Sequence, residues 1–381
     1  MPSVLIVAMS RISSDGRVLR HIKALKNDYQ VITIGYGSNP AGVFRHIPIP
    51  DAMPYLPTNL SAIIPHLLHK YSDSSQNVSA IRFIRETIAQ LEFDFAVLND
   101  VQTLPLMESI KCPTLIDMHE YAPREMEDDL RFRLFLMRYY EWLCAKYLPG
   151  ATAVTTVSDS LASEFKREFG VNVSVILNAR EYLDIKVNQT TSSKLRLIHT
   201  GLAARGRKLD VMIDAVANMP ELQLDLFLVS APRQKSTMRR LKRRAEATKN
   251  VRVVDPVPTF KIPYLINRYD LALVFMSPKG FSVRHSMPNK LFDSIQARVG
   301  IVSGPSPDIR SFCERNGTGV ATEEFSVNSL RSTLLTLSVS SINRFKTSCD
   351  EAAKVYNAET EARKLSKIIM GCLQEKNKGS N

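Results

Sequence analysis

The segment HSMPNKLFDSIQARVGIVS, residues 285–303, places a proline, an amide and a lysine where a helix is expected to begin. Pro288 suits the first turn of a helix, because proline has no N–H group to leave unpaired there. The backbone N–H groups of Asn289, Lys290 and Leu291 would then point out of the helix end. Together with the helix dipole and the lysine charge, these groups predict an anion site.

One turn further along, Asp293 adds a carboxylate to the same predicted helix. A carboxylate can accept hydrogen bonds from a diol while the helix start holds a phosphate. The combination therefore suits the ribose and phosphates of a nucleotide. Proline and aspartate are also common in the first turns of helices that bind nothing, so the segment alone leaves both interpretations open.

A second candidate site lies in the loop GLAARGRK, which follows the predicted strand LRLIHT. Gly201 allows a ligand to approach the backbone closely, and Arg205, Arg207 and Lys208 suit a diphosphate. A solvated cluster of surface charges is the alternative interpretation of this loop.

Two further candidate loops follow predicted strands of the N-terminal half. SRISSDGR follows VLIVAM and carries Asp15, Gly16 and Arg17, but it lacks a GxGxxG pattern and therefore does not indicate a dinucleotide site. His119 and Glu120 follow TLIDM, where they suit polar contacts to a sugar or to a charge that develops during a reaction.

Strands and helices alternate along the whole chain, which predicts an α/β protein with doubly wound parallel sheets. In the N-terminal half, apolar runs predict strands at Val4–Met9, Tyr29–Tyr36, Phe93–Asn99, Thr114–His119, residues 151–158 and Val173–Asn178. In the C-terminal half they predict strands at residues 195–201, 222–230, 270–276 and 318–321 and another directly after the helix that begins at Pro288. The intervening segments predict helices, the first with Ser14 or Asp15 as its N-cap. Residues 58–92 are expected to be mostly helical with a polar break at SDSSQN, and one long helix is expected from Asp128 to Leu148.

The polar segment DIKVNQTTSSK, residues 184–194, has no periodicity and is predicted to link two domains. We expect an N-terminal α/β domain over residues 1–183 and a second over residues 195–357, followed by a C-terminal helix over residues 358–381. Ligands of such sheets bind beyond the carboxyl ends of the strands, so a central cleft between facing domains is the expected site.

Composition excludes several classes of protein. The 381 residues suffice for two domains, and 44% hydrophobic with 23% charged residues is an ordinary globular composition. The five cysteines are scattered without a CxxC pair, so neither a zinc site nor a disulfide framework is predicted. No apolar run reaches the roughly 18 residues of a membrane span, and the N-terminus does not resemble a signal peptide. A cytoplasmic protein is the simplest expectation.

The net charge of +12 suits nucleic acid, anionic lipid or phosphorylated ligands. The densest basic cluster runs from Arg233 to Lys249. It is interpreted either as a solvated helix face or as a surface that contacts an anionic membrane. No zinc finger, aromatic RNA-binding motif or heptad zipper is present, so no nucleic-acid partner is expected. The apolar segment from Asn59 to Tyr71 ends in basic residues and suits either a membrane edge or packing on the sheet.

Several of these segments, in this order and spacing, resemble the family 4 retaining glycosyltransferases, which have the GT-B architecture of two facing Rossmann-like domains. The similar segments are DGRVLRHIKAL, LIDMHE, TTVSDSLASEF followed by VILNA, PNKLFDSIQARVGIVSGPSPDIRSFCERNGTGV and YNAETEARKL. The resemblance covers nearly the whole chain. It implies transfer of a sugar from a nucleotide-diphosphate sugar, such as a UDP- or GDP-sugar, with retention. It also implies that residues 1–183 form a Rossmann-like domain on the acceptor side and residues 195–357 a Rossmann-like domain for the nucleotide-sugar donor, with the helix over residues 358–381 crossing back to the first.

The resemblance assigns roles to residues of the N-terminal half. His119 matches the family's histidine, which contacts the donor sugar near the reacting carbon. Gly16 and Arg17 match the loop that lies over the phosphates. Asp15 and Glu120 are expected on the acceptor side, with the acceptor near residues 10–17, 50–75 and 119–130.

The donor site of the family carries over only in part. The family's pair of glutamates separated by seven residues falls on His285 and Asp293; the aspartate keeps the ability to bind ribose hydroxyls, whereas the histidine serves only by hydrogen bonding. The family's arginine falls on Leu202, and its lysine on Arg207 or Lys208. Arg205 is a candidate for the missing cation, and Pro288, Asn289 and Leu291 match the family's donor-site helix.

In this fold, retaining transfer depends on stabilising the departing diphosphate, which the resemblance assigns to Arg207, Lys208, Lys290 and the helix start. The chain is therefore expected to need no metal and no cofactor. The acidic run Glu127–Asp129 is interpreted as a helix N-terminus rather than a metal site.

The leading hypothesis is a glycosyltransferase of cell-surface polysaccharide or glycolipid assembly. Its acceptor would be a saccharide or a lipid-linked molecule. The protein would attach peripherally to the anionic inner face of the plasma membrane. Two alternatives share the fold: a sugar-nucleotide 2-epimerase, and a catalytically degenerate subunit that scaffolds a partner, which Leu202 and His285 favour.

Overall fold

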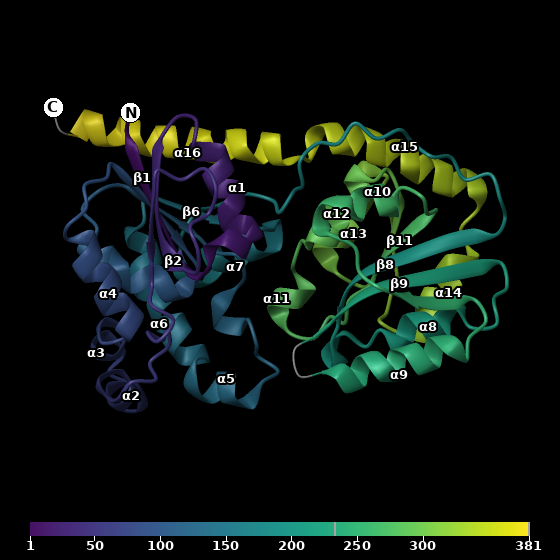
Figure 1. Ribbon diagram of the computed structural model, residues 1–381, viewed down its shortest axis with the longest axis horizontal. Coiled ribbons are helices and arrows are strands. Elements are labelled where there is room, and N and C mark those ends of the chain that lie inside the picture. The colour runs from purple at the N-terminus through teal and green to yellow at the C-terminus, as the bar shows by residue number, and fades with distance from the viewer. Residues whose placement is uncertain (232–233, 380–381) are drawn as a thin grey trace. The chain divides into compact units, whose positions relative to one another are not determined.

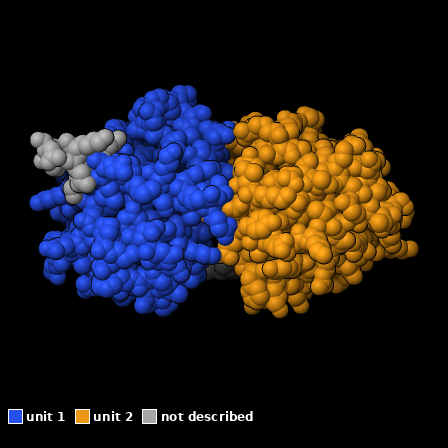
Figure 2. Space-filling model, turned by 90° about the horizontal axis from the view of Figure 1, so that it is seen from above, with its two compact units in different colours: residues 1–177, 280–282, 359–381 blue, residues 178–279, 283–358 orange. Residues whose placement is uncertain are grey.

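The computed structural model describes residues 1–231 and 234–379, so Arg233 of the basic cluster and the last two residues of the expected C-terminal helix lie outside them. The chain forms two compact units, each coloured separately in Figure 2. Unit 1 comprises Met1–Leu177, Gly280–Ser282 and the chain from Glu359 onward, and unit 2 comprises Asn178–Lys279 and Val283–Ala358.

Unit 1 is built on a sheet of seven parallel strands in the order β3-β2-β1-β4-β5-β6-β7. The strands are β1 Ser3–Arg11, β2 Gln30–Tyr36, β3 Arg45–Pro48, β4 Phe95–Asn99, β5 Thr114–Asp117, β6 Ala153–Thr156 and β7 Val173–Val175. Their order reverses direction at β1 and β4, and the loops after β1, β4 and β5 meet at the carboxyl edge of the sheet.

Helices cover both faces of this sheet because alternate residues of its strands are apolar on both sides. Leu5 and Val7 of β1 face a core formed with α4 Ser79–Ile88, α6 Met137–Tyr147 and α7 Asp159–Phe169. Ile6 faces the opposite core, formed with α1 Gly16–Leu25 and α16 Ala358–Gly379. The remaining helices are α2 Leu60–Leu67, α3 Tyr71–Gln76, α5 Leu130–Phe135, and the 3-10 segments η1 Ile12–Ser14, η2 Val101–Ser109, η3 Ala122–Arg124 and η4 Leu148–Gly150.

Unit 2 is built on a sheet of six parallel strands in the order β10-β9-β8-β11-β12-β13. The strands are β8 Leu195–Ala203, β9 Leu222–Ser230, β10 Val251–Val254, β11 Leu271–Val274, β12 Gly300–Ser303 and β13 Gly319–Ala321. Within this unit, Figure 1 shows helices on either side of the strands. The expected fold class, two parallel-sheet α/β domains, is therefore confirmed.

The helices of unit 2 likewise form one core on each face of the sheet. One core joins the sheet to α8 Asp210–Val216, α9 Lys235–Glu246 and α14 Val327–Leu335, and the other joins it to α10 Ile262–Ile266 and the end of α12 Asn289–Gln296. The further elements are α11 Phe281–Arg284, α13 Pro307–Asn316, α15 Val339–Val355, η5 Arg205–Arg207 and η6 Thr259–Lys261.

Three local expectations were wrong. SDSSQ is not a break but most of α3, and the chain turns instead at residues 68–70 and 77–78. The long helix expected from Asp128 to Leu148 is two helices, α5 and α6, which meet at Leu136. The predicted loop after β8 is shorter than expected, because β8 continues through Gly201 to Ala203 in register with β9.

The predicted linker, residues 184–194, is irregular and packs on unit 2. The backbone N–H of Thr190 donates to Asn343 of α15 at 2.8 Å, and the Lys346 ammonium donates to the carbonyl of Asn188 at 2.7 Å. In the part of the chain that the structure describes, no helix combines the length and apolar composition needed to cross a bilayer.

Candidate functional site

In unit 2, two cations from the predicted sites interact: Arg207, which follows β8, and Lys290, at the start of α12. Lys290 lies in the first turn of α12 and reaches over Gly201 near the carboxyl end of β8. A Cβ atom built on this glycine would lie 3.0 Å from Lys290 Cε and 3.2 Å from its Nζ. The missing side chain of Gly201 therefore makes the space in which the Lys290 ammonium lies.

The positive charge of Arg207 repels the Lys290 ammonium and so disfavours protonation of Lys290. Burial lowers the pKa of Lys290 to about 8, and repulsion by Arg207 adds to this effect while Asp293 opposes it. Within residues 1–231 and 234–379, no carboxylate forms an ion pair with either Lys290 or Arg207, whose Nη1 donates to Met276 Sδ at 3.5 Å. Two sheltered cations without a counter-ion are suited to hold an anion.

Sequence reasoning missed His199, which lies beside these cations. Its Nδ1 is 2.8 Å from the carbonyl oxygen of Leu273, and its Nε2 would be 3.3 Å from a Cβ on Gly201. Burial lowers the pKa of His199 to about 3, with a contribution from Lys290. The imidazole is therefore neutral, donates through Nδ1 and presents the Nε2 lone pair towards the space around Gly201. Its position in an apolar strand gave no sequence signal.

The start of α12 differs from the prediction in one respect. Pro288 is the N-cap residue rather than the first helical residue, with extended backbone angles. The N–H of Leu291 donates to the Pro288 carbonyl at 3.0 Å, so it is not one of the outward-facing amides that were expected. Leu291 is fully buried, whereas Asn289 is exposed at the helix start beside Lys290. The predicted anion site therefore retains the amides of Asn289 and Lys290.

Asp293 is buried and pairs with Arg180. Its Oδ1 accepts from Arg180 Nε at 2.5 Å, and the same guanidinium donates to the carbonyl of Thr259 at 3.1 Å. A nucleoside that binds Asp293, as predicted, would therefore share this carboxylate with Arg180.

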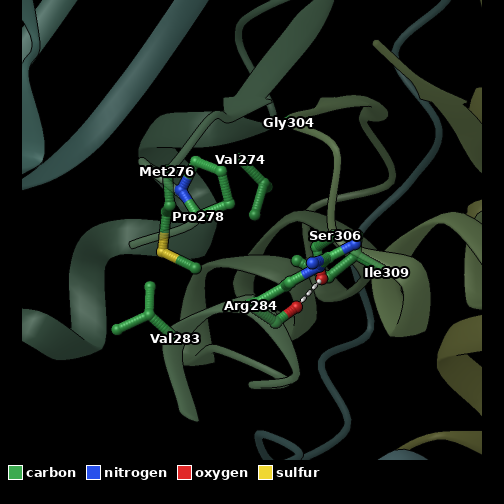
Figure 3. Close-up of a pocket in the computed structure, with 8 residues that line it drawn as sticks. All are labelled: Val274, Met276, Pro278, Val283, Arg284, Gly304, Ser306 and Ile309. Carbon is green, nitrogen blue, oxygen red and sulfur yellow. Dashed lines mark hydrogen bonds between the residues drawn. The ribbon is translucent and has the colours of Figure 1, made fainter. Parts of the chain in front are cut away.

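His285 lies after α11, and Asp308 in the first turn of α13 holds its ring. The distance from His285 Nδ1 to Asp308 Oδ2 is 2.9 Å. A cavity of about 10 Å³ underlies the segment that carries this histidine. Figure 3 shows its lining by Met276 and Pro278, and the Ser306 hydroxyl that donates to the Arg284 carbonyl at 2.8 Å.

The other predicted residues of this unit lie around η5. Arg205 and Lys208 are exposed, and Lys208 has a left-handed backbone conformation with φ of 46°. The backbone N–H of Arg205 donates to Gln234 at 2.8 Å. Leu202, at the position of the resembled family's arginine, is 38% exposed on β8.

In unit 1, Arg17 is not on the loop surface but inside the carboxyl edge of the sheet. Its Nε and Nη2 donate to the two carboxylate oxygens of Asp117 at 2.8 and 2.7 Å, and its Nη1 donates to the Ile176 carbonyl at 2.7 Å. Burial disfavours the Asp117 carboxylate, but Arg17 outweighs that effect and holds the pKa of Asp117 well below its usual range. The phosphate contact predicted for Gly16 and Arg17 would fall to the exposed Gly16.

His119 is brought against two carboxylates. Its Nδ1 lies 3.2 Å from Asp100 Oδ2, and its Nε2 lies 3.1 Å from Asp117 Oδ2. Burial opposes protonation of this imidazole, but the negative charges of Asp100 and Asp117 outweigh it and raise the pKa of His119. Sequence reasoning found His119 and missed both carboxylates, although Asp100 and Asp117 end neighbouring strands.

His119 and Glu120 line a cavity of about 160 Å³ with Asp100, Gln102 and Glu125. Asp100 has a positive φ of 65°, unusual for a residue other than glycine, and its carboxylate accepts from the His119 N–H at 3.2 Å. Such strained residues cluster at functional sites. Burial and the neighbouring Asp100 carboxylate raise the pKa of Glu125. The cavity is suited to hydroxyl groups, which donate to carboxylates.

Asp15 caps α1, as predicted for one of two residues. Its Oδ1 accepts from the N–H groups of Arg17 and Val18 at 3.0 and 3.1 Å, and Ser10 donates to its Oδ2 at 2.6 Å. The acidic run Glu127–Asp129 is a helix N-terminus, as predicted, because Asp129 caps α5.

Comparison with known proteins gives structural relatives only. No protein-family model matches the chain, and no curated protein matches it in sequence. Among solved structures, HepE of Anabaena in complex with UDP and glucose has a TM-score of 0.68 at 14% identity, over 97% of this chain and 100% of that chain. Sucrose-phosphate synthase of Thermosynechococcus elongatus has a TM-score of 0.70 at 11% identity, over 98% and 100%.

A third similar structure is the α,α-trehalose 6-phosphate synthase of Burkholderia multivorans, with a TM-score of 0.68 at 10% identity and full coverage of both chains. The fold is GT-B. At these identities the similarity establishes the architecture, and the chemistry must be argued from the residues of this chain. In this architecture, both clusters of polar residues lie at carboxyl edges of their sheets, where α/β sheets bind ligands.

Proposed function

We propose that the protein is a glycosyltransferase that uses a nucleotide-diphosphate sugar as donor. The observation that carries the proposal is the pair of sheltered cations, Arg207 and Lys290, with no carboxylate partner among the described residues. They lie beside a glycine that keeps the backbone accessible, at the carboxyl edge of a GT-B domain. A diphosphate supplies the negative charge that this arrangement lacks.

The donor's nucleoside would extend from the diphosphate towards Asp293, one turn along α12. The donor would be a UDP- or GDP-sugar; the structure of HepE with UDP and glucose supports the first of these. The polar cavity of unit 1, which His119 lines, would receive a hydroxyl of the acceptor, a saccharide or a lipid-linked molecule.

The proposed reaction proceeds with retention and without a metal or another cofactor. As the bond between the sugar and the diphosphate breaks, Arg207, Lys208, Lys290 and the start of α12 stabilise the developing negative charge. An oxygen of the departing phosphate takes the proton of the acceptor hydroxyl, whose oxygen bonds to the sugar on the same face. We place the enzyme in cell-surface polysaccharide or glycolipid assembly, in the cytoplasm at the inner face of the plasma membrane.

The test is a thermal-shift screen of UDP-, GDP-, CMP- and ADP-sugars. A ligand at 100 times its dissociation constant should stabilise the protein by roughly 2.7 kcal/mol. Arg207→Ala should weaken binding of the nucleoside diphosphate far more than that of the nucleoside. Arg310→Ala is the matched control, because this arginine of unit 2 pairs with the exposed Glu323. Equal losses for diphosphate and nucleoside would remove the assigned role.

Product analysis separates the two alternatives of the same fold. A 2-epimerase would convert the nucleotide sugar with no acceptor present. A catalytically degenerate subunit would bind the nucleotide tightly and turn over none of the donors. The exposed Leu202 and the His285–Asp308 pair, in place of an arginine and a free carboxylate, are the observations that favour the degenerate subunit.

A further inference from the structure

One helix of unit 1 exposes an apolar face to solvent. Leu60, Ile64, Leu67 and Leu68 of the segment around α2 are 54–77% exposed. Their spacing places them on one side of the helix, while Ala62 and His66 are buried on the other. The helix is therefore anchored by one face and leaves an aliphatic face uncovered.

A second helix, α5, extends this surface. Leu130, Leu134 and Phe135 are 49–67% exposed, and Phe132 is buried beneath them. The two helices are joined where His66 Nε2 lies 2.6 Å from the Phe135 carbonyl oxygen. Figure 1 shows α2 and α5 at the same end of unit 1. We name these seven exposed side chains the α2–α5 patch.

Cations surround this patch. Lys70 follows α2, Arg131 and Arg133 alternate with the apolar residues of α5, and Arg138 begins α6; all four are exposed. Within residues 1–231 and 234–379, none of the four forms an ion pair with a carboxylate. The nearby Asp129 is engaged in capping α5. The patch therefore combines exposed aliphatic side chains with four cations that make no direct ion pair in the described part of the chain, beside the Asp129 carboxylate that caps α5.

We propose that the α2–α5 patch docks on an anionic lipid bilayer. Aliphatic side chains can enter the boundary between head groups and acyl chains, while lysine and arginine contact anionic head groups. A second copy of the chain is a poorer occupant, because a two-fold contact through this patch would bring its like-charged cations together. The surplus of positive charge in the chain, +12, agrees with an anionic partner.

This inference rests on the proposed function in one respect, the lipid-linked acceptor; binding of the patch to a bilayer does not depend on it. The cavity of unit 1 is lined by Ala122 and Glu125, and α5 begins only five residues after Glu125. A bilayer bound at the patch would therefore hold lipid-linked acceptors near the carboxylates of that cavity.

The test is co-sedimentation with vesicles of phosphatidylcholine containing about 30 mol % phosphatidylglycerol, at low salt. Ile64→Glu combined with Leu134→Glu should lower the partition coefficient at least about tenfold. The matched control is Phe260→Glu combined with Leu335→Glu, which adds the same charge at two exposed apolar sites of unit 2 and should bind like the wild type.

Further arms decide between occupants. Binding should fall without phosphatidylglycerol and with added salt, and also in Arg131→Ser combined with Arg133→Ser. If the wild-type protein did not co-sediment with the vesicles at low salt, the proposal would be overturned. It would also be overturned if sedimentation velocity showed a dimer that only the patch variant abolishes. Thermal shifts with UDP-sugars on the same variants should match wild type, so loss of vesicle binding with intact nucleotide binding separates this proposal from the proposed function.

Discussion

Lys290 lies across Gly201, so that a methyl group on this glycine would meet the lysine side chain at 3.0 Å. A glycine is needed here for space and not for backbone conformation, because Gly201 lies within the regular strand β8. The absence of a side chain at Gly201 of β8 therefore determines where the Lys290 ammonium of α12 lies.

Gly201→Ala should therefore displace the Lys290 ammonium and weaken binding of a nucleoside diphosphate by about tenfold, or ~1.4 kcal/mol, which is the scale of one hydrogen bond to a charged group. Isothermal titration calorimetry with UDP measures this loss. Gly206→Ala is the control, because no atom lies within 4 Å of its built Cβ. Equal affinities of the two variants would contradict the position assigned to Lys290.

Nucleoside diphosphate affinity should decrease as the pH rises through about 8, the lowered pKa of Lys290. Above that pH the free protein has lost the ammonium proton, and binding of the anion must take it up again. Titrations of UDP in buffers of different ionisation enthalpy should show proton uptake at pH 8.5, where the phosphates are already fully ionised. A flat affinity profile from pH 7 to 9.5 would argue against this titration.

The same lowered pKa has a consequence for stability without ligand. Unfolded chains keep the lysine pKa of 10.5, so between pH 8 and 10.5 the unfolded state binds more protons than the folded state. The contribution of Lys290 to the free energy of unfolding should accordingly rise with pH across this window. Lys290→Met should remove that rise, as measured by urea denaturation at several pH values.

Breaking the buried pair of Arg17 and Asp117 should destabilise unit 1 by about 3–5 kcal/mol, because the buried Asp117 carboxylate loses the guanidinium that pairs with both of its oxygens. Arg17→Met should thus lower the denaturant midpoint strongly. The control is Arg11→Ala, since Arg11 and Asp51 form an exposed pair that is worth about 0–1 kcal/mol. If Arg17→Met instead reduced nucleotide affinity in a protein of unchanged stability, the buried role would be refuted.

Asp100→Asn should lower the pKa of His119, because the Asp100 charge is the main stabiliser of its protonated form. Titration of the histidine signals by NMR gives this pKa directly, and Asp51→Asn should leave it unchanged. If Asp100→Asn left the His119 titration unaltered, the two groups would not be coupled. Transfer activity should fall with the same variant, because Asp100 and His119 both line the cavity proposed to receive the acceptor hydroxyl.

The strands that sequence reasoning missed are the edges of the two sheets, β3 and β10. Each has only four residues and lies at one edge of its sheet, so neither gives the long apolar run of a strand that is covered on both faces. The interior strands were found because both of their faces are covered by helices, which makes their sequence apolar throughout. The two parallel-sheet α/β domains were therefore predictable from the pattern of the chain, whereas the GT-B architecture was predicted from the resemblance to a known family.

The residues of the candidate sites divide in the same way. Sequence by itself predicted that Arg207 and His119 follow strands and that Lys290 begins a helix, whereas it placed Gly201 in a loop rather than in β8. It also determined the capping role of an acidic residue before α1, because a cap is decided within one turn of chain.

Only the tertiary structure decided which charges are compensated. Arg17 and Arg207 each lie shortly after the first strand of a unit, yet one pairs with Asp117 across the sheet and the other has no carboxylate partner among the described residues. Asp117 lies 100 residues from Arg17 in sequence. Whether a charge is free to bind a ligand depends on such distant neighbours, which local sequence patterns do not encode.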